Sequence, residues 1–452
     1  MTHRSSKLLL GCLLAFQMTN TPIGTIDILV NDIEVDFPES ITFYLEAAST
    51  SPIVSAELEY GTDTLACGES VSRAIPEDYQ PEATIEVEWT WDLRRSGSLP
   101  PGTQVWWRWV LEDSTGAVMT TPEQWITFLD DVIPWKQVET DHLDLFWYVG
   151  TEDFAQQLLD AGEQALIRLH QMTGVAFDET IEVYIYASPE DMQAATLFAP
   201  DWSGGRAFPW DNAVIIGVAP AQLEWGMETM AHEITHVVVG HYTFSCFDST
   251  PGWVDEGLAM IVEGDADPYL ESILQDAIDT DTLLSVRELG YIFSADPDLA
   301  RLSYAESYSL VTFLLELFGD EPMLALLDRF REGDSEDRAL EAVYGFDRDG
   351  LEGLWRDWIG APPMELPPDV EATPTATPYP TLAPISQPEV QGSPTPDAGE
   401  IASEAESELT AQASERREDS APGFPLCSSI QWLGAPILGI IAFAIRRFNR
   451  SL

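Results

Sequence analysis

The sequence contains very little positive charge. Lysine and arginine total 21 against 77 aspartates and glutamates, which gives a formal net charge of −56, and Lys7 and Lys136 are the only lysines. Such an excess of carboxylates repels phosphate backbones, so we exclude nucleic acid as a partner of the folded body. The balance is typical of a strongly solvated, exported or salt-tolerant protein, and an acidic cleft would favour basic peptides.

Cysteine is also scarce, with four residues in the chain. Cys12 and Cys427 belong to the terminal segments, which leaves Cys67 and Cys246 in the body, either paired in an oxidising compartment or present as buried thiols. The sequence has no G-x-S-x-G segment, no phosphate-cradling glycine-rich loop and no C-x-x-C pair. No serine-nucleophile, nucleotide-binding or dithiol motif therefore competes with the motif that follows.

Histidine occurs only six times, and two of the six fall in the segment 232–236, which reads H-E-x-x-H. Residues four apart on a helix share a face, so His232 and His236 can bind one metal ion. Glu233 is then placed to take a proton from a zinc-bound water. The alternative is a core helix whose histidines only form hydrogen bonds, and that alternative leaves Glu233 unexplained.

The surrounding segment predicts a helix. Residues 224–239 carry apolar side chains at helical spacing and no proline, and Gly240 is a candidate for the end of the helix. A catalytic zinc ion needs a third protein ligand. Glu256, twenty residues after His236, is our candidate, on a second helix beyond the loop 248–252. Alternatively, Glu256 is only a first-turn carboxylate favoured by the helix dipole.

The H-E-x-x-H segment, followed after about twenty residues by W-x-x-E-G-x-A, resembles the gluzincin metallopeptidases. More narrowly, residues 135–360 resemble the peptidase-MA-like domain related to aminopeptidase N and thermolysin. The resemblance implies a zinc ion (Zn2+) held by His232, His236 and Glu256, with Glu233 as the general base. The H-E-x-x-H-x-x-G-x-x-H pattern of other zinc peptidases is out of register here, so His241 is expected to be a bystander.

The resemblance also implies two substrate-contacting features. One is a short edge strand that aligns the substrate backbone, for which Gly204, Gly205 and Ala207 are the candidates. The other is a tyrosine that donates to the developing oxyanion. Tyr304 is the candidate for this role and Tyr308 is the second choice, although both tyrosines can also be packing residues.

The sequence departs from these relatives in two places. No G-x-M-E-N segment, which holds a free α-amine in the aminopeptidase N group, lies upstream of the predicted zinc helix, so endopeptidase activity is favoured. Met260 stands where thermolysin has an aspartate that supports a ligand histidine. Asp255 and Glu263 are both available to replace that partner, and the sequence does not choose between them.

The rest of the chain predicts a multidomain protein. Residues 25–130 contain short alternating runs, such as 41–45 and 54–60, that predict an all-β, immunoglobulin-like or fibronectin-like sandwich. Residues 135–360 predict an α+β peptidase domain of gluzincin type with a mostly helical C-terminal lobe. Residues 361–423, rich in Pro, Thr, Ser and Glu, predict a disordered stalk.

The two ends of the chain predict export and anchoring. Residues 1–20 resemble a signal peptide, in which Cys12 is a weak lipidation candidate. Residues 424–445 carry no charge and predict a single transmembrane helix, followed by a basic cytoplasmic tail at 446–452. We therefore expect a single-pass cell-surface protein whose catalytic part is outside the cell, with its membrane contact through the C-terminal helix.

Two classes of function follow from these observations. The first is a surface-anchored zinc metallopeptidase that hydrolyses peptide bonds of a peptide or protein substrate with a zinc-bound water activated by Glu233. The alternative is a surface protein that binds a peptide or protein without turnover, through a degenerate peptidase-like domain or through the β-sandwich.

Overall fold

A computed structural model describes residues 26–68, 71–76, 79–198, 204–264, 267–290 and 296–364. The predicted signal segment 1–20, the stalk beyond residue 364, the transmembrane helix 424–445 and the tail 446–452 lie outside these residues. In the part of the chain that is described, no helix combines the length and the apolar character needed to cross a membrane.

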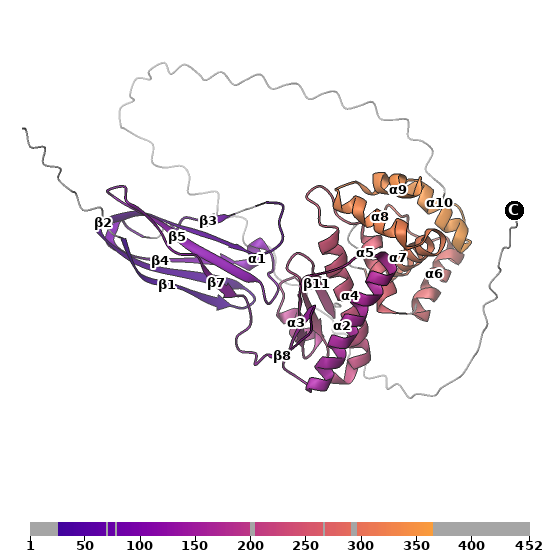
Figure 1. Ribbon diagram of the computed structural model, residues 1–452, viewed down its shortest axis with the longest axis horizontal. Coiled ribbons are helices and arrows are strands. Elements are labelled where there is room, and N and C mark those ends of the chain that lie inside the picture. The colour runs from indigo at the N-terminus through magenta and orange to yellow at the C-terminus, as the bar shows by residue number, and fades with distance from the viewer. Residues whose placement is uncertain are drawn as a thin grey trace, which may run out of the picture. The chain divides into compact units, whose positions relative to one another are not determined.

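The N-terminal β region is entirely antiparallel (Figure 1). Its long strand β2 pairs with β1 and β4 through residues 40–49 and with β3 and β5 through residues 53–62. The strands are β1 (Ile26–Asp36), β2 (Ser40–Thr62), β3 (Ser72–Ala74), β4 (Glu82–Asp92), β5 (Gln104–Asp113), β6 (Val118–Thr120) and β7 (Gln124–Thr127), with the short helix α1 (Leu93–Ser96) after β4.

The sequence pattern predicted two separate strands at 41–45 and 54–60, but the structure joins them in β2. The chain stays extended past Pro52 and changes register between Ala48 and Ile53 in place of a turn. Both halves bury alternate side chains, such as Phe43 and Leu58, in one core. The prediction of an antiparallel β region is confirmed, whereas its immunoglobulin-like topology stays a prediction.

A second, mixed sheet begins the α+β part, with the strand order β11-β12-β10-β9-β8. The three central strands are parallel, and both edge strands are antiparallel to their neighbours. Strand β12 is buried on both faces, which explains its uninterrupted apolar run, and β10 is buried at every position except Glu182. The bounds are β8 (Lys136–Glu139), β9 (Leu143–Trp147), β10 (Ile181–Tyr186), β11 (Gly205–Phe208) and β12 (Ala213–Gly217).

Helices cover this sheet and continue beyond it, and they confirm the predicted helical C-terminal part (Figure 1). One sheet face shares a core with α2 and α4, and the other packs on Met192 of α3 and on Trp135. The helices are α2 (Glu152–Thr173), α3 (Pro189–Ala194), α4 (Leu223–Tyr242), α5 (Gly252–Glu263), α6 (Pro268–Thr280), α7 (Pro297–Phe318), α8 (Asp320–Arg331), α9 (Glu336–Tyr344) and α10 (Arg348–Ile359), with a 3-10 turn at Pro220–Gln222.

The structure corrects the predicted end of one helix and decides the state of two cysteines. Helix α4 does not end at Gly240 but continues to Tyr242. Gly240 lies against Pro209, where an added Cβ would lie 2.7 Å from the proline ring. This glycine therefore permits close packing against the segment after β11. Cys67 and Cys246, which the sequence left either free or paired, form a disulfide between the β region and the loop after α4.

Candidate metal centre

The centre is built on neighbouring helices that pack against each other. Helix α4 presents His232 and His236 on one face, four residues apart, and α5 presents Glu256 toward them. The two Nε2 atoms are 3.0 Å apart, and each lies 3.4 Å from Oε2 of Glu256. The three side chains are 13–21 % exposed, so they are mostly buried but reachable from solvent.

These three atoms fit a zinc ion. They lie within 4.8 Å of one another, and among the described residues no other group of three or more His, Cys, Asp or Glu residues converges in this way. Oε2 of Glu256 is buried and accepts no hydrogen bond, which is costly for a carboxylate oxygen unless a cation occupies the site. Two imidazole nitrogens and one carboxylate oxygen form a ligand set that zinc peptidases use.

Each histidine is oriented by a second carboxylate. Nδ1 of His232 lies 3.1 Å from Oε2 of Glu263, and Nδ1 of His236 lies 2.9 Å from Oδ2 of Asp255. Such contacts fix the ring orientation and leave Nε2 available to a metal ion. The sequence offered Asp255 and Glu263 as alternatives, and the structure brings both to the site, one for each histidine.

Electrostatics separate the roles of the two glutamates. Burial disfavours the charged form of Glu256, but the two imidazoles outweigh burial and lower its pKa. Burial also opposes protonation of His232, yet Glu256 and Glu263 raise the pKa of His232 to about 9. For Glu233 burial dominates and raises the pKa, which suits a carboxylate that takes up a proton during a reaction.

A cavity of about 460 Å³ contains the centre. Gly204, Gly205 and Ala207, predicted as the substrate-aligning strand, line it opposite α4. A Cβ at Gly205 would lie 2.6 Å from Oε1 of Glu233, and a Cβ at Gly204 would lie 2.4 Å from the Trp225 ring. Only glycines therefore let this strand approach α4 so closely.

Tyr304 of α7 lines this cavity, whereas Tyr308, one turn later, lines only a second cavity described below. Burial, together with the nearby Glu256 and Glu233 carboxylates, raises the pKa of Tyr304, so its hydroxyl keeps its proton at neutral pH and can donate it in a hydrogen bond. His241 lies apart from the metal-binding group, with Nε2 3.5 Å from Oε1 of Glu179.

Four further residues line the metal cavity that the sequence interpretation did not identify: Trp225, Thr229, Arg206 and Pro209. Trp225 and Thr229 precede Glu233 by eight and four residues, so helical spacing places them on its face of α4. That spacing was readable from the sequence. Arg206 lies between Gly205 and Ala207 in β11, and nothing in its sequence context distinguished it from a surface arginine.

A protein-family model matches the part of the chain that contains the candidate metal centre. Residues 161–361 match the family model described as Peptidase MA superfamily, and this range includes the three candidate ligands and Glu233. The chain contains a Peptidase MA superfamily domain. No curated protein matches the chain.

The similarity of the chain to solved structures is distant. Aminopeptidase A of Legionella pneumophila is 11 % identical, with 73 % of this chain and 49 % of that chain covered and a TM-score of 0.36. An M1 zinc metallopeptidase of Deinococcus radiodurans is 11 % identical, with 76 % and 95 % covered and a TM-score of 0.33. A family 56 carbohydrate-binding module, a β-1,3-glucan binding domain, is 9 % identical, with 22 % and 98 % covered and a TM-score of 0.15. Similarity at this level does not indicate a shared activity.

Within the Peptidase MA domain, the first turn of α5 is tied to the loop 283–290. The backbone N–H of Trp253 donates to the carbonyl of Leu289 at 3.0 Å, and the Trp253 indole donates to Oε1 of Glu336 at 2.7 Å. Trp253 is fully buried and lies three residues before Glu256. These bonds therefore fix the helix that presents the third candidate ligand.

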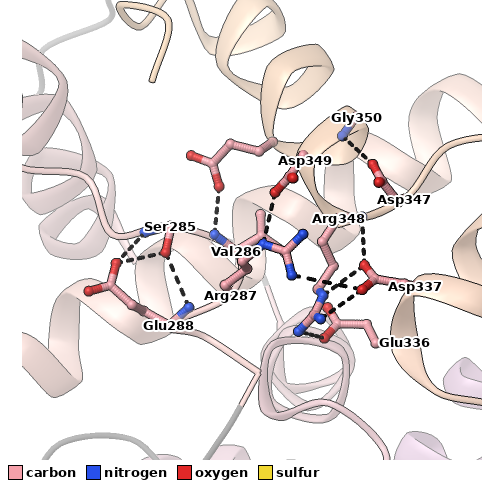
Figure 2. A network of polar contacts seen from close by, with 11 residues as sticks. Ser285, Val286, Arg287, Glu288, Glu336, Asp337, Asp347, Arg348, Asp349 and Gly350 are labelled. Carbon is pink, nitrogen blue, oxygen red and sulfur yellow. Dashed lines mark hydrogen bonds and ion pairs between the residues drawn. The ribbon is translucent and has the colours of Figure 1, made fainter. Parts of the chain in front are cut away.

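The loop itself is held by carboxylates from α7 and α10. Glu306 accepts the N–H of Leu284 at 2.9 Å, and Glu352 accepts the N–H of Val286 at 2.6 Å. Figure 2 shows Val286 and Arg287 of this loop beside Arg348, whose guanidinium donates to Asp337 and Glu336. A polar network thus connects α9 and α10 to the start of α5.

Proposed function

We propose that this chain is a zinc-dependent peptidase that hydrolyses internal peptide bonds of a peptide or protein. The observation that carries the proposal is the convergence of both Nε2 atoms on an unsatisfied, buried Glu256 oxygen, with Glu233 in the same cavity. Nε2 of His232, Nε2 of His236 and Oε2 of Glu256 would hold the ion. When bound, zinc supplies a Lewis acid for the scissile carbonyl and increases the acidity of water.

The other steps belong to the chain's own residues. Glu233 takes a proton from the attacking water and delivers it to the leaving nitrogen, and its raised pKa matches this double duty. The Tyr304 hydroxyl donates a hydrogen bond to the carbonyl oxygen as negative charge develops there. Both side chains line the same cavity, which supports their joint action on one bond.

Strand β11 supports binding of an extended substrate. It is an outer strand of the described sheet, and Gly205 and Ala207 line the cavity beside Glu233. An extended peptide can add to such an edge through main-chain hydrogen bonds, which hold the backbone whatever its side chains are. The absence of a G-x-M-E-N segment upstream favours an endopeptidase over an aminopeptidase.

The proposed setting is the cell surface. The signal-like segment 1–20 and the apolar segment 424–445 support an anchored protein with an external catalytic part. The Cys67–Cys246 disulfide is a second, independent support, because such bonds persist in oxidising compartments. A peptidase-like domain that binds without turnover is the competing function, and the Glu233 carboxylate in the cavity argues against it.

The test uses the full chain, purified in detergent, beside Glu233→Gln. We expect both proteins to bind one zinc ion, measured by elemental analysis after dialysis. We expect the unsubstituted chain to cleave a mixed peptide pool, followed by mass spectrometry, and Glu233→Gln to be slower by at least about 100-fold. If the unsubstituted chain retains zinc but cleaves nothing, the binding function replaces the peptidase. If it binds no zinc, the metal site is wrong.

A further inference from the structure

A second cavity of about 570 Å³ opens beside the metal centre. His232, Glu263 and Tyr304 line both this cavity and the metal cavity, so the two spaces meet at the candidate ligands. We call the second cavity the helical groove. None of the roles proposed above for Glu233, Tyr304 or β11 uses its remaining residues.

The helical groove lies between one face of α6 and one face of α7. Its lining positions recur at helical spacing, from Asp267 to Ile278 on α6 and from Tyr304 to Thr312 on α7. Eight residues of helix between Tyr304 and Thr312 correspond to a length of about 12 Å. Trp358 and Ile359 of α10 complete the lining. The groove therefore extends away from the metal centre for more than the length of one side chain.

The helical groove combines acidic and apolar side chains. The acidic ones are Glu263, Asp267 and Glu271, and Glu263 lies 3.1 Å from His232 at the metal centre. The lining also contains a set of partly exposed apolar side chains, which are Met260, Leu270, Leu274, Ile278 and Trp358. Trp358 alone is 41 % exposed. A concave apolar surface of this kind gains free energy when an apolar group displaces its water.

We propose that the helical groove binds a large apolar side chain, such as phenylalanine or leucine, on the substrate residue next to the cleaved bond. The proposal rests on the proposed function. It follows from continuity: the two cavities share His232, Glu263 and Tyr304, so a substrate residue whose carbonyl lies in the metal cavity can place its side chain in the helical groove. The carboxylates of Glu263, Asp267 and Glu271 in the lining disfavour an aspartate or glutamate at the same substrate position.

The first experiment compares peptides that differ at a single position. Mass spectrometry of cleaved pools locates the favoured position relative to the cut, and matched peptides then carry Phe, Leu, Ala or Asp there. We expect kcat/KM for Phe and Leu to exceed that for Ala by at least about tenfold, and Asp to be the poorest substrate. Equal kcat/KM values for Phe and Ala would overturn the proposal.

A substitution then ties the preference to the helical groove. Gln275 is exposed on α6 and lines the groove, so Gln275→Trp places an indole in it without disturbing the core. Asp276→Trp, at the adjacent exposed position that does not line the groove, is the matched control. We expect the Phe-to-Ala ratio to fall to about one in Gln275→Trp and to stay unchanged in Asp276→Trp. An unchanged ratio in both variants contradicts the proposal.

A binding measurement separates this proposal from the peptidase function. With the Glu233→Gln chain loaded with zinc, calorimetry compares the affinities of the Phe and Ala peptides. Tighter binding of the Phe peptide that is lost in Glu233→Gln/Gln275→Trp supports the groove even if the unsubstituted chain cleaves nothing. Equal affinities reject the groove even if cleavage is observed.

Discussion

The helical part of the molecule contains two groups of carboxylates that differ in their partners. The metal-facing carboxylates are Asp255, Glu256 and Glu263. The framework carboxylates are Glu306, Glu336 and Glu352. Members of the first group lie against imidazoles, whereas those of the second accept hydrogen bonds from backbone or indole N–H groups or pair with arginine. The same residue type therefore serves a candidate metal site in the first group and stabilises the fold in the second.

The difference is visible in the pKa values. The two imidazoles lower the pKa of Glu256 although burial acts in the other direction. Burial raises the pKa of Glu306 to about 8 and that of Glu336 to about 7. The N–H of Leu284 beside Glu306, and the Trp253 indole and Arg348 beside Glu336, do not compensate for the lost water. Substitutions in the first group should change metal binding and catalysis, and those in the second should change stability.

The comparison predicts its largest effect at Glu256. In Glu256→Gln the third ligand loses its charge, so we expect zinc affinity to fall by at least about 100-fold and cleavage to be lost. Competition with a chelating dye measures the affinity. Glu316→Gln, which changes an exposed carboxylate on α7, is the control and should behave as the unsubstituted chain. Tight zinc binding by Glu256→Gln would place the third ligand elsewhere.

The next effect concerns the close approach of strand β11 to Glu233. In Gly205→Ala the new Cβ would lie 2.6 Å from Oε1 of Glu233, so the base or the strand must move. We expect kcat to fall by about 100-fold with zinc affinity little changed, since displacements of about 1 Å have such effects. Gly353→Ala on α10, where a Cβ meets nothing within 4 Å, is the matched control. Unaltered kcat in Gly205→Ala would show that the close approach is not needed.

A smaller effect is expected at the carboxylates that orient the histidines. Asp255→Asn and Glu263→Gln each keep an acceptor near Nδ1 but remove its charge, so zinc affinity should fall by about 10- to 100-fold. The same dye competition measures it, with stability checked by urea unfolding in chelator. If these variants lose stability and keep zinc affinity, Asp255 and Glu263 belong with the framework carboxylates.

The sequence predicted the residues of the candidate metal centre better than the framework carboxylates, and the reason is physical. His232, Glu233 and His236 are brought together by one helix turn, so their spacing alone indicates a shared face. Glu256 required a second helix at a suitable loop length, which the W-x-x-E-G-x-A segment indicated through resemblance. The roles of Asp255 and Glu263 depended on the relative rotation of α4 and α5, which no local pattern contains.

The framework carboxylates and the helical groove were outside the reach of sequence patterns. Glu306 and Glu352 resemble surface residues of amphipathic helices until packing shows that they accept the N–H groups of the loop 283–290. The groove needs three helices that are distant in sequence, α6, α7 and α10. In strand β2 the sequence pattern predicted a break that is absent. The stretch 47–52 is typical of a turn, yet it continues as strand.

The smallest effect on zinc binding is expected at Glu306, where we predict a dependence of stability on pH. In the unfolded chain its pKa has the ordinary value of 4.5, and in the folded chain burial raises the pKa to about 8. Below pH 4.5 both states hold the proton, so Glu306 adds no dependence. Between pH 4.5 and 8 the folded state retains a proton that the unfolded state releases, so the free energy of unfolding falls as the pH rises.

Glu306→Gln removes this titration while its Oε1 can still accept the N–H of Leu284. Between pH 5 and 8 we expect the decline of the unfolding free energy with pH to become shallower, by at most about 1.4 kcal/mol per pH unit, which corresponds to one proton. Urea unfolding in chelator, followed by tryptophan fluorescence, measures the slope. The slope is the decisive quantity, because the new amide N–H₂ replaces an unpartnered Oε2 and can lower stability equally at every pH. A slope equal to that of the unsubstituted chain would mean that Glu306 is ionised in the fold, and the distinction between framework and metal-facing carboxylates would then rest on their partners alone.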